Sequence, residues 1–282
     1  MSQSPNPDLL SLNTATVREK WSLRQMIEGC ARHGIRGISP WRDKLAELGA
    51  KQAAQLIRAN GMRVTGLCRG GMFPAVNRQG RQAAIEDNLR AIDDAAMLEA
   101  RCLVLVVGGM PPGSKDLAGA RAQVRDGIGT VLDHARSCGV PLAIEPLHPM
   151  YAADRACVNT MAQANDLCDE LVGKDGTGLG IALDVYHVWW DPELEVQIGR
   201  AGREKRIFAY HICDWLVPTT DLLLDRGMMG DGVIDLPKIR GWMEEAGYAG
   251  FHEVEIFSAG NWWKRDPDEV LEVVKQRHAD CT

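Results

Sequence analysis

Short apolar runs alternate with amphipathic stretches along the whole chain of 282 residues. Many of the runs are rich in Val, Ile and Leu, and most follow a turn signal such as Gly34 or Gly61, as expected for buried strands. The predicted strands cover residues 9–12, 35–39, 62–68, 102–107, 142–144, 179–183, 207–212 and 251–257.

Helical periods fill the stretches between these runs, for example at 23–34, 85–100, 124–139, 161–173 and 236–247. Alternating strand and helix units predict parallel strands joined by right-handed crossovers. A doubly wound sheet usually has a glycine-rich phosphate loop after its first strand, but residues 11–21 contain no GxGxxG. Because no linker or low-complexity segment divides the chain, we predict a single (β/α)8 TIM barrel over residues 1–282.

Four consecutive predicted strands carry Glu145, Asp184, His211 and Glu255 at or near their C-terminal ends. Active-site groups of α/β barrels come from these ends, so the four side chains are expected to meet at one mouth. Glu253 lies on the same strand face as Glu255, and we interpret it as a buried supporting residue.

Three carboxylates converging in a cavity repel one another, and burial adds a desolvation cost that a divalent cation removes. A set of one imidazole and three carboxylates suits Mn²⁺ first, with Mg²⁺, Co²⁺ or Zn²⁺ as alternatives. We therefore predict one divalent metal ion bound by Glu145, Asp184, His211 and Glu255.

The chain resembles the xylose isomerase-like TIM-barrel superfamily, which includes sugar epimerases, hydroxypyruvate isomerases, inosose dehydratases and endonuclease IV. The motifs that carry the resemblance are AIEPLHP, ALDVYH, AYHICDW, GMMGDGVIDL and GYAGFHEVEIFS. Where members often carry an acid at the end of strand two, this sequence has Ser-Pro-Trp-Arg at 39–42.

The resemblance implies that the four residues named above are metal ligands and that Glu145 and Glu255 are also the catalytic acid and base. It further implies that His187 and Arg226 bind substrate. His148 is either a loop cap or a third catalytic group acting as a general base. Asp214, three residues after His211, is expected to orient that imidazole or to contact substrate.

The predicted reaction is removal of a proton beside a carbonyl to give an enediolate, which a metal ion stabilises. This chemistry predicts an isomerase or epimerase acting on a small carbohydrate-like substrate: a sugar, keto-sugar or cyclitol. The alternatives are a metal-dependent lyase or dehydratase, a C-glycoside-cleaving subunit, an abasic-site endonuclease and a non-catalytic sugar-binding barrel. Residues 227–232 could bind a substrate phosphate, but Asp231 inside this glycine-rich segment favours an unphosphorylated substrate.

Composition limits which binding partners and which cellular location we expect. A net charge of −6 and a pI of about 5.7 argue against nucleic acid as the main partner. No signal-peptide pattern and no run of about 18 apolar residues is present, so we expect no membrane association. Eight scattered cysteines without a CxxC pair predict buried, reduced thiols and a cytoplasmic protein; the sequence leaves homo-oligomer formation open.

Overall fold

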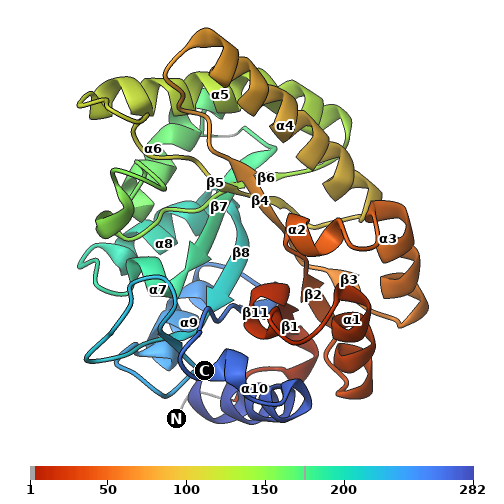
Figure 1. Ribbon diagram of the computed structural model, residues 1–282. Coiled ribbons are helices and arrows are strands. Elements are labelled where there is room, and N and C mark those ends of the chain that lie inside the picture. Colours follow the sequence, from red (N-terminus) through yellow and green to blue (C-terminus); the bar gives the residue numbers. More distant parts are fainter. Residues whose placement is uncertain (1–3, 175) are drawn as a thin grey trace.

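A ring of parallel strands surrounded by helices forms the protein (Figure 1). The computed structural model describes residues 4–174 and 176–282. Over those residues the strands of the ring are β1 (Leu10–Asn13), β2 (Gly37–Ser39), β3 (Arg63–Val64), β4 (Leu67–Gly71), β5 (Leu103–Val106), β6 (Leu142–Ile144), β7 (Leu179–Asp184), β8 (Ile207–Ile212) and β11 (His252–Val254).

The order of the strands shows that the ring closes. Hydrogen-bonded neighbours run β3-β2-β1-β11-β8-β7-β6-β5-β4, and every pair is parallel. Only Thr65 and Gly66 separate β3 from β4, so these two short strands occupy one position in the barrel. A parallel bridge between Trp41 and Cys68 extends the contact between that position and β2. The predicted (β/α)8 barrel is confirmed.

The helices lie outside the ring, with their apolar faces against the strands. They are α1 (Leu23–Arg32), α2 (Arg42–Leu45), α3 (Ala50–Ala59), α4 (Arg78–Met97), α5 (Leu117–Ser137), α6 (Met161–Val172), α7 (Val185–Val188), α8 (Leu194–Arg203), α9 (Leu236–Glu245) and α10 (Pro267–Cys281). Short 3-10 helices are η1 (Pro7–Leu9), η2 (Thr14–Val17), η3 (Pro149–Tyr151) and η4 (Trp262–Lys264), and a small hairpin pairs β9 (Asp214–Trp215) with β10 (Arg226–Gly227).

Two helices begin seven residues earlier than their apolar period predicts. Helix α4 begins at Arg78, where the Asn77 side chain accepts a hydrogen bond from the Gly80 N–H. Helix α5 begins at Leu117, where Asp116 caps in the same way. The first turn of α4 is mostly polar, and that of α5 consists of Leu, Gly and Ala residues that are mostly not buried, so the caps mark the starts and the hydrophobic pattern does not.

The first and last helices of the chain close the outer layer. Figure 1 shows α10 beside α1. His33, at the end of α1, lies with its Nδ1 2.7 Å from Glu272 and its Nε2 2.7 Å from Asp268, both on α10. The two ends of the helical layer are thereby joined.

Small side chains fill the barrel beneath its C-terminal mouth. Cys102, Ala143, Ala182 and Ala209 are buried in one cluster with Cys68 and Val104. The thiols expected to be buried and reduced are all free, and six of the eight are buried; Cys138 and Cys281 are half-buried.

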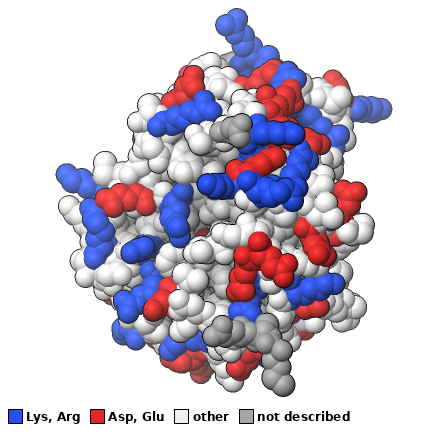
Figure 2. Space-filling view, turned by 180° about the vertical axis from the view of Figure 1, so that it is seen from behind, with Lys and Arg blue, Asp and Glu red and all other residues white. Residues whose placement is uncertain are grey.

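On the face shown in Figure 2, Lys and Arg side chains are interspersed with Asp and Glu side chains on a surface formed mostly by other residues. Among the helices of the described chain, none combines the length and the apolar character needed to cross a bilayer.

Asn88 on α4 fixes the end of β4 to the helical layer. Its side chain donates to the Gly71 carbonyl at 2.8 Å and accepts from the Gly71 N–H at 2.7 Å. Asn88 is fully buried and Gly71 is buried as well, so removing the Asn88 side chain takes a hydrogen-bond partner from each of these two backbone groups.

We expect Asn88→Ala to lower the free energy of unfolding by about 3 kcal/mol, because it leaves two buried backbone groups unpaired. Urea denaturation measures the change. The matched control is Gln82→Ala on the exposed face of the same helix, which should cost less than about 0.5 kcal/mol. Equal effects of the two substitutions would contradict this role for Asn88.

Candidate metal centre

Four side chains from consecutive barrel strands meet at the C-terminal mouth. Glu145 directly follows β6, Asp184 ends β7, His211 lies near the end of β8 and Glu255 directly follows β11. One ligand atom from each lies within 4.8 Å of the others, and all four residues are buried. The structure therefore brings together the four residues that the sequence predicts as one group.

The imidazole of His211 faces this centre with one nitrogen. Its Nδ1 lies 3.0 Å from Glu145 Oε1 and 3.8 Å from Glu255 Oε2. Its Nε2 points into the barrel and lies 3.4 Å from Glu253 Oε1. A carboxylate beside the second ring nitrogen of a metal-binding histidine favours one tautomer and one ring orientation.

Glu253 is itself held from below. Asn13 Nδ2 donates to Glu253 Oε1 and Thr65 Oγ1 donates to Glu253 Oε2, each at 2.8 Å. The Glu253 carboxylate contacts His211 and is not part of the group of four at the centre, whereas Glu255 is. This geometry agrees with the interpretation of Glu253 as a buried supporting residue.

Burial and mutual charge shift the ionisation of the group. Burial raises the pKa of Glu255 to about 8, although Arg226 and His211 oppose the shift. Burial also opposes ionisation of Asp184, but Arg226, His187 and His211 outweigh it and lower the pKa of that carboxyl. For His211 burial acts against the charged form, yet Glu253 and Glu145 raise its pKa well above the usual value.

The donor atoms fit a divalent cation. Glu145 Oε1 and both ring nitrogens of His211 are buried and make no hydrogen bond within the described chain. Buried polar atoms without such a bond are costly unless another partner satisfies them. Three carboxylates and one imidazole nitrogen at a common point supply that partner's ligand set.

Arg226 on β10 supplies positive charge at the rim of the centre. Its Nη1 donates to Asp184 Oδ2 at 2.8 Å and lies 3.3 Å from Glu255 Oε2. The guanidinium packs 4.4 Å from the Tyr186 ring centroid and 5.1 Å from that of Phe257. It is therefore held between the ligand carboxylates and an aromatic wall.

His187 on α7 lies beside Arg226, with Nε2 3.3 Å from Arg226 Nη2 and 3.5 Å from Asp184 Oδ2. Burial lowers the pKa of His187 to about 3, so the ring is neutral near pH 7. Both residues line the cavity above the centre, which is where a substrate-binding role requires them.

The cavity also contains residues that the sequence reasoning did not single out. Trp41 Nε1 donates to Glu255 Oε1 at 3.2 Å, and Tyr151 and Phe257 line the same space. Trp41 follows β2 by two residues, so reading the ends of all strands would have found it.

His148 adopts the loop-capping alternative. Its Nδ1 accepts from the Met150 N–H at 3.3 Å at the start of η3, and its ring stacks on Trp215 with centroids 5.1 Å apart. It is not among the described residues that line the cavity. The geometry thus gives no support to His148 as the general base.

The expected contact between Asp214 and His211 is wrong. Asp214 instead accepts from four backbone N–H groups at 2.9–3.0 Å, those of Trp215, Gly230, Gly232 and Ile234. The carboxylate is therefore occupied in shaping the loop that carries Arg226, and Glu253 takes the position beside the imidazole. The same bonds occupy two N–H groups of segment 227–232 that a phosphate would need.

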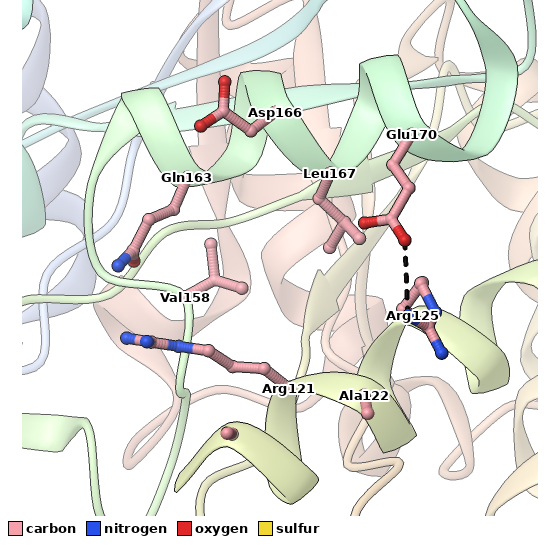
Figure 3. Close-up of a pocket in the computed structure, with 9 residues that line it drawn as sticks. Arg121, Ala122, Arg125, Val158, Gln163, Asp166, Leu167 and Glu170 are labelled. Carbon is pink, nitrogen blue, oxygen red and sulfur yellow. Dashed lines mark hydrogen bonds and ion pairs between the residues drawn. The ribbon is translucent and has the colours of Figure 1, made fainter.

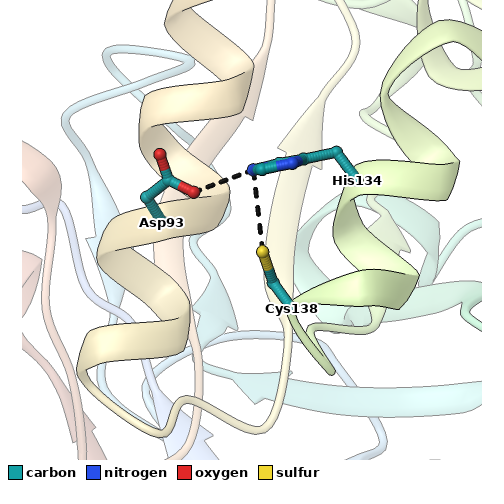
Figure 4. A group of neighbouring side chains, drawn as sticks. All are labelled: Asp93, His134 and Cys138. Carbon is teal, nitrogen blue, oxygen red and sulfur yellow. Dashed lines mark hydrogen bonds and ion pairs between the residues drawn. The ribbon is translucent and has the colours of Figure 1, made fainter.

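Two other features lie on the outer helices. Asp93 on α4 and Cys138 at the end of α5 both contact the same atom, His134 Nε2, at 2.8 and 3.6 Å (Figure 4). A groove between α5 and α6 is lined by charged and apolar side chains and is crossed by the Arg125–Glu170 ion pair (Figure 3). Apart from buried Val158 in the groove, the side chains of both features are partly or largely exposed, in contrast with the four buried candidate ligands at the mouth.

We expect Glu253→Gln to weaken Mn²⁺ binding by about 10- to 100-fold, because a neutral amide orients the His211 imidazole less strongly. Calorimetric titration of the metal-free protein measures the affinity. Glu86→Gln, an exposed change on α4, is the matched control and should leave the affinity unchanged. Identical affinities for both variants would show that Glu253 does not position the ligand.

Mn²⁺ binding should also strengthen as pH rises toward about 8, the pKa of Glu255. Below that pH the metal-free protein holds a proton on Glu255, and the raised pKa of His211 adds a second one. A cation must displace these protons, so the affinity should rise about tenfold or more per pH unit. A flat profile below pH 8 would contradict the pKa assignments.

Comparisons with known proteins agree with the fold. The family model described as xylose isomerase-like TIM barrel matches residues 27–276. An inosose isomerase of Bacillus velezensis is 25% identical over 283 residues, covering 95% of this chain and 94% of that protein.

Solved structures extend the similarity. Protein SMc04130 from Sinorhizobium meliloti 1021 is 59% identical, with a TM-score of 0.95 and coverage of 98% of this chain and 99% of that one. The IOLI protein, whose structure contains a bound zinc atom, shares the fold at 22% identity with a TM-score of 0.81, covering 96% and 97% of the two chains. The predicted resemblance is confirmed: this chain belongs to the xylose isomerase-like TIM-barrel family.

Proposed function

We propose that this protein is a divalent-metal-dependent isomerase or epimerase of a keto-cyclitol or keto-sugar. The observation that carries the proposal is the position of Glu145 and Glu255, which share one cavity and one candidate metal centre. Similarity to an inosose isomerase over nearly the full length supports an isomerase. A small carbohydrate-like substrate and a cytoplasmic location remain our expectations.

A divalent cation held by Glu145, Asp184, His211 and Glu255 would supply Lewis-acid stabilisation of negative charge developing on substrate oxygen. Mn²⁺ is our preferred ion for this oxygen-rich ligand set.

The two glutamates approach the cavity from different sides. Glu145 follows β6 and Glu255 follows β11, and β7 and β8 separate these strands in the barrel. Removal of a proton by one carboxylate and its return by another require this arrangement. Protonation of the same carbon on its opposite face gives epimerisation, and protonation of the neighbouring carbon gives isomerisation.

Glu145 and Glu255 both line the cavity, so one carboxylate can take the substrate proton while the other delivers a proton to the substrate. We assign substrate orientation to Arg226 and neutral His187, which would bind oxygens beside the reacting carbon.

Mn²⁺-loaded protein in D2O should introduce deuterium beside the carbonyl of a keto-cyclitol or ketose, which mass spectrometry detects. Glu145→Gln and Glu255→Gln should each reduce this exchange at least about 100-fold, since each removes an acid–base group. Loss of water from the substrate, detected in the same spectra, would identify a dehydratase instead of an isomerase.

The matched control is Glu86→Gln, which lies on the exposed face of α4 and should retain full exchange. Binding of sugar and metal without any deuterium uptake would instead identify a non-catalytic sugar-binding barrel. Metal-dependent cleavage of abasic DNA that is lost in Glu255→Ala would support the endonuclease alternative.

A further inference from the structure

Two arginines at the cavity have no acidic partner. Arg69 and Arg155 line the same space as Glu145, Glu255 and Arg226, and within the described chain neither side chain forms an ion pair. The nearby arginine on α2 behaves differently, because Arg42 binds Asp87 through two hydrogen bonds of 2.7 and 3.0 Å.

The backbone of β4 turns Arg69 toward the cavity. Successive residues of a regular strand point to opposite faces, so a strand that directs Cys68 inward would direct Arg69 outward. The pairing of β4 with β5 skips a residue here: Cys68 pairs with Val104 and Gly70 with Leu105. Arg69 is thus the extra residue of a bulge, a feature that re-aims side chains near functional sites, and both Cys68 and Arg69 line the cavity.

Arg155 is held by a fixed loop on the other side. Its guanidinium lies 5.5 Å from the ring centroid of Tyr151, which also lines the cavity. Its carbonyl accepts from the Gly108 N–H at 3.0 Å, which fixes the loop to the segment after β5. The two arginines are close enough that the charge of Arg155 adds to burial in lowering the pKa of Arg69.

The charge balance of the cavity indicates which kind of ligand the guanidinium groups of Arg69 and Arg155 bind. Three arginines, Arg69, Arg155 and Arg226, face four carboxylates, those of Glu145, Glu255, Asp184 and Glu253. A divalent cation at the centre therefore leaves one positive charge without a counterpart. A neutral sugar would not compensate this charge, whereas an anionic group on the substrate would.

We propose that the substrate is an anionic keto-cyclitol or keto-sugar whose carboxylate or phosphate binds Arg69 and Arg155 at the cavity mouth. The planar guanidinium binds both anions through paired hydrogen bonds. This inference rests on the proposed function for the reacting end of the substrate. It adds that the substrate is an acidic sugar or cyclitol and not a neutral one. It also moves anion binding away from segment 227–232, whose N–H groups bind Asp214.

Calorimetric titration of the full-length protein, with and without Mn²⁺, tests the proposal with three probes. D-glucose is the neutral probe, D-glucuronate carries a carboxylate and D-glucose 6-phosphate carries a phosphate. At least one anionic probe should bind about tenfold or more tightly than glucose, and the stronger of the two identifies the substrate's anion. Arg69→Gln and Arg155→Gln should each reduce that preference about tenfold, the loss expected for one charged hydrogen bond.

The matched control is Arg203→Gln, an exposed change at the end of α8 that removes the same charge outside the cavity and should preserve the preference. Circular dichroism and metal content confirm that each variant is folded. Equal binding of neutral and anionic probes, no binding of either anion, or a preference that survives both substitutions would overturn the inference.

The outcome is separable from that of the proposed function. Arginine-dependent anion binding by a protein that exchanges no substrate proton would refute the proposed reaction and leave the anion site standing. If the protein exchanged deuterium into neutral substrates, and both arginine variants did so equally, only the anion site would be refuted.

Discussion

The organisation of this protein follows from one electrostatic constraint: three buried carboxylates at the end of a closed barrel need positive charge close by. Asp184 has Arg226 at 2.8 Å, and Glu145 has the His211 imidazole at 3.0 Å. The negative charge of Glu255 is compensated least, and its pKa of about 8 reflects the remaining free-energy cost of ionising this buried carboxyl group. A divalent cation removes this cost, so metal binding and proton release are coupled through the same group.

Support for the centre comes from two directions. From below, Glu253 contacts the His211 ring and is itself fixed by Asn13 and Thr65. From above, Asp214 gathers four backbone N–H groups and shapes the loop that delivers Arg226. Neither residue is among the four that meet at the centre: Glu253 acts on one of them, His211, and Asp214 acts on the loop that carries Arg226 at the rim. Positioning of this kind is what keeps a preformed site rigid.

The barrel and the meeting of the four candidate ligands were predictable because both depend on strand positions, and apolar runs locate strands well. Glu145, Asp184, His211 and Glu255 each fall at or near a strand end, where a parallel barrel must bring them together. The starts of α4 and α5 escaped prediction because capping residues set them. Asp214 was misjudged because it lies only three residues after His211, which suggested a contact between them. The chain turns after β8, and Asp214 binds the following loop instead. Arg69 could not be assigned from alternation, since a bulge reverses the face on which it lies.

The packed interior of the barrel also has a kinetic consequence. Cys102, Ala143, Ala182 and Ala209 are buried in one cluster within the barrel, so packed side chains lie beneath the centre. Under the proposed function, substrate and product would then share the entrance at the mouth. A slowly released product would compete with the next substrate molecule for the same cavity.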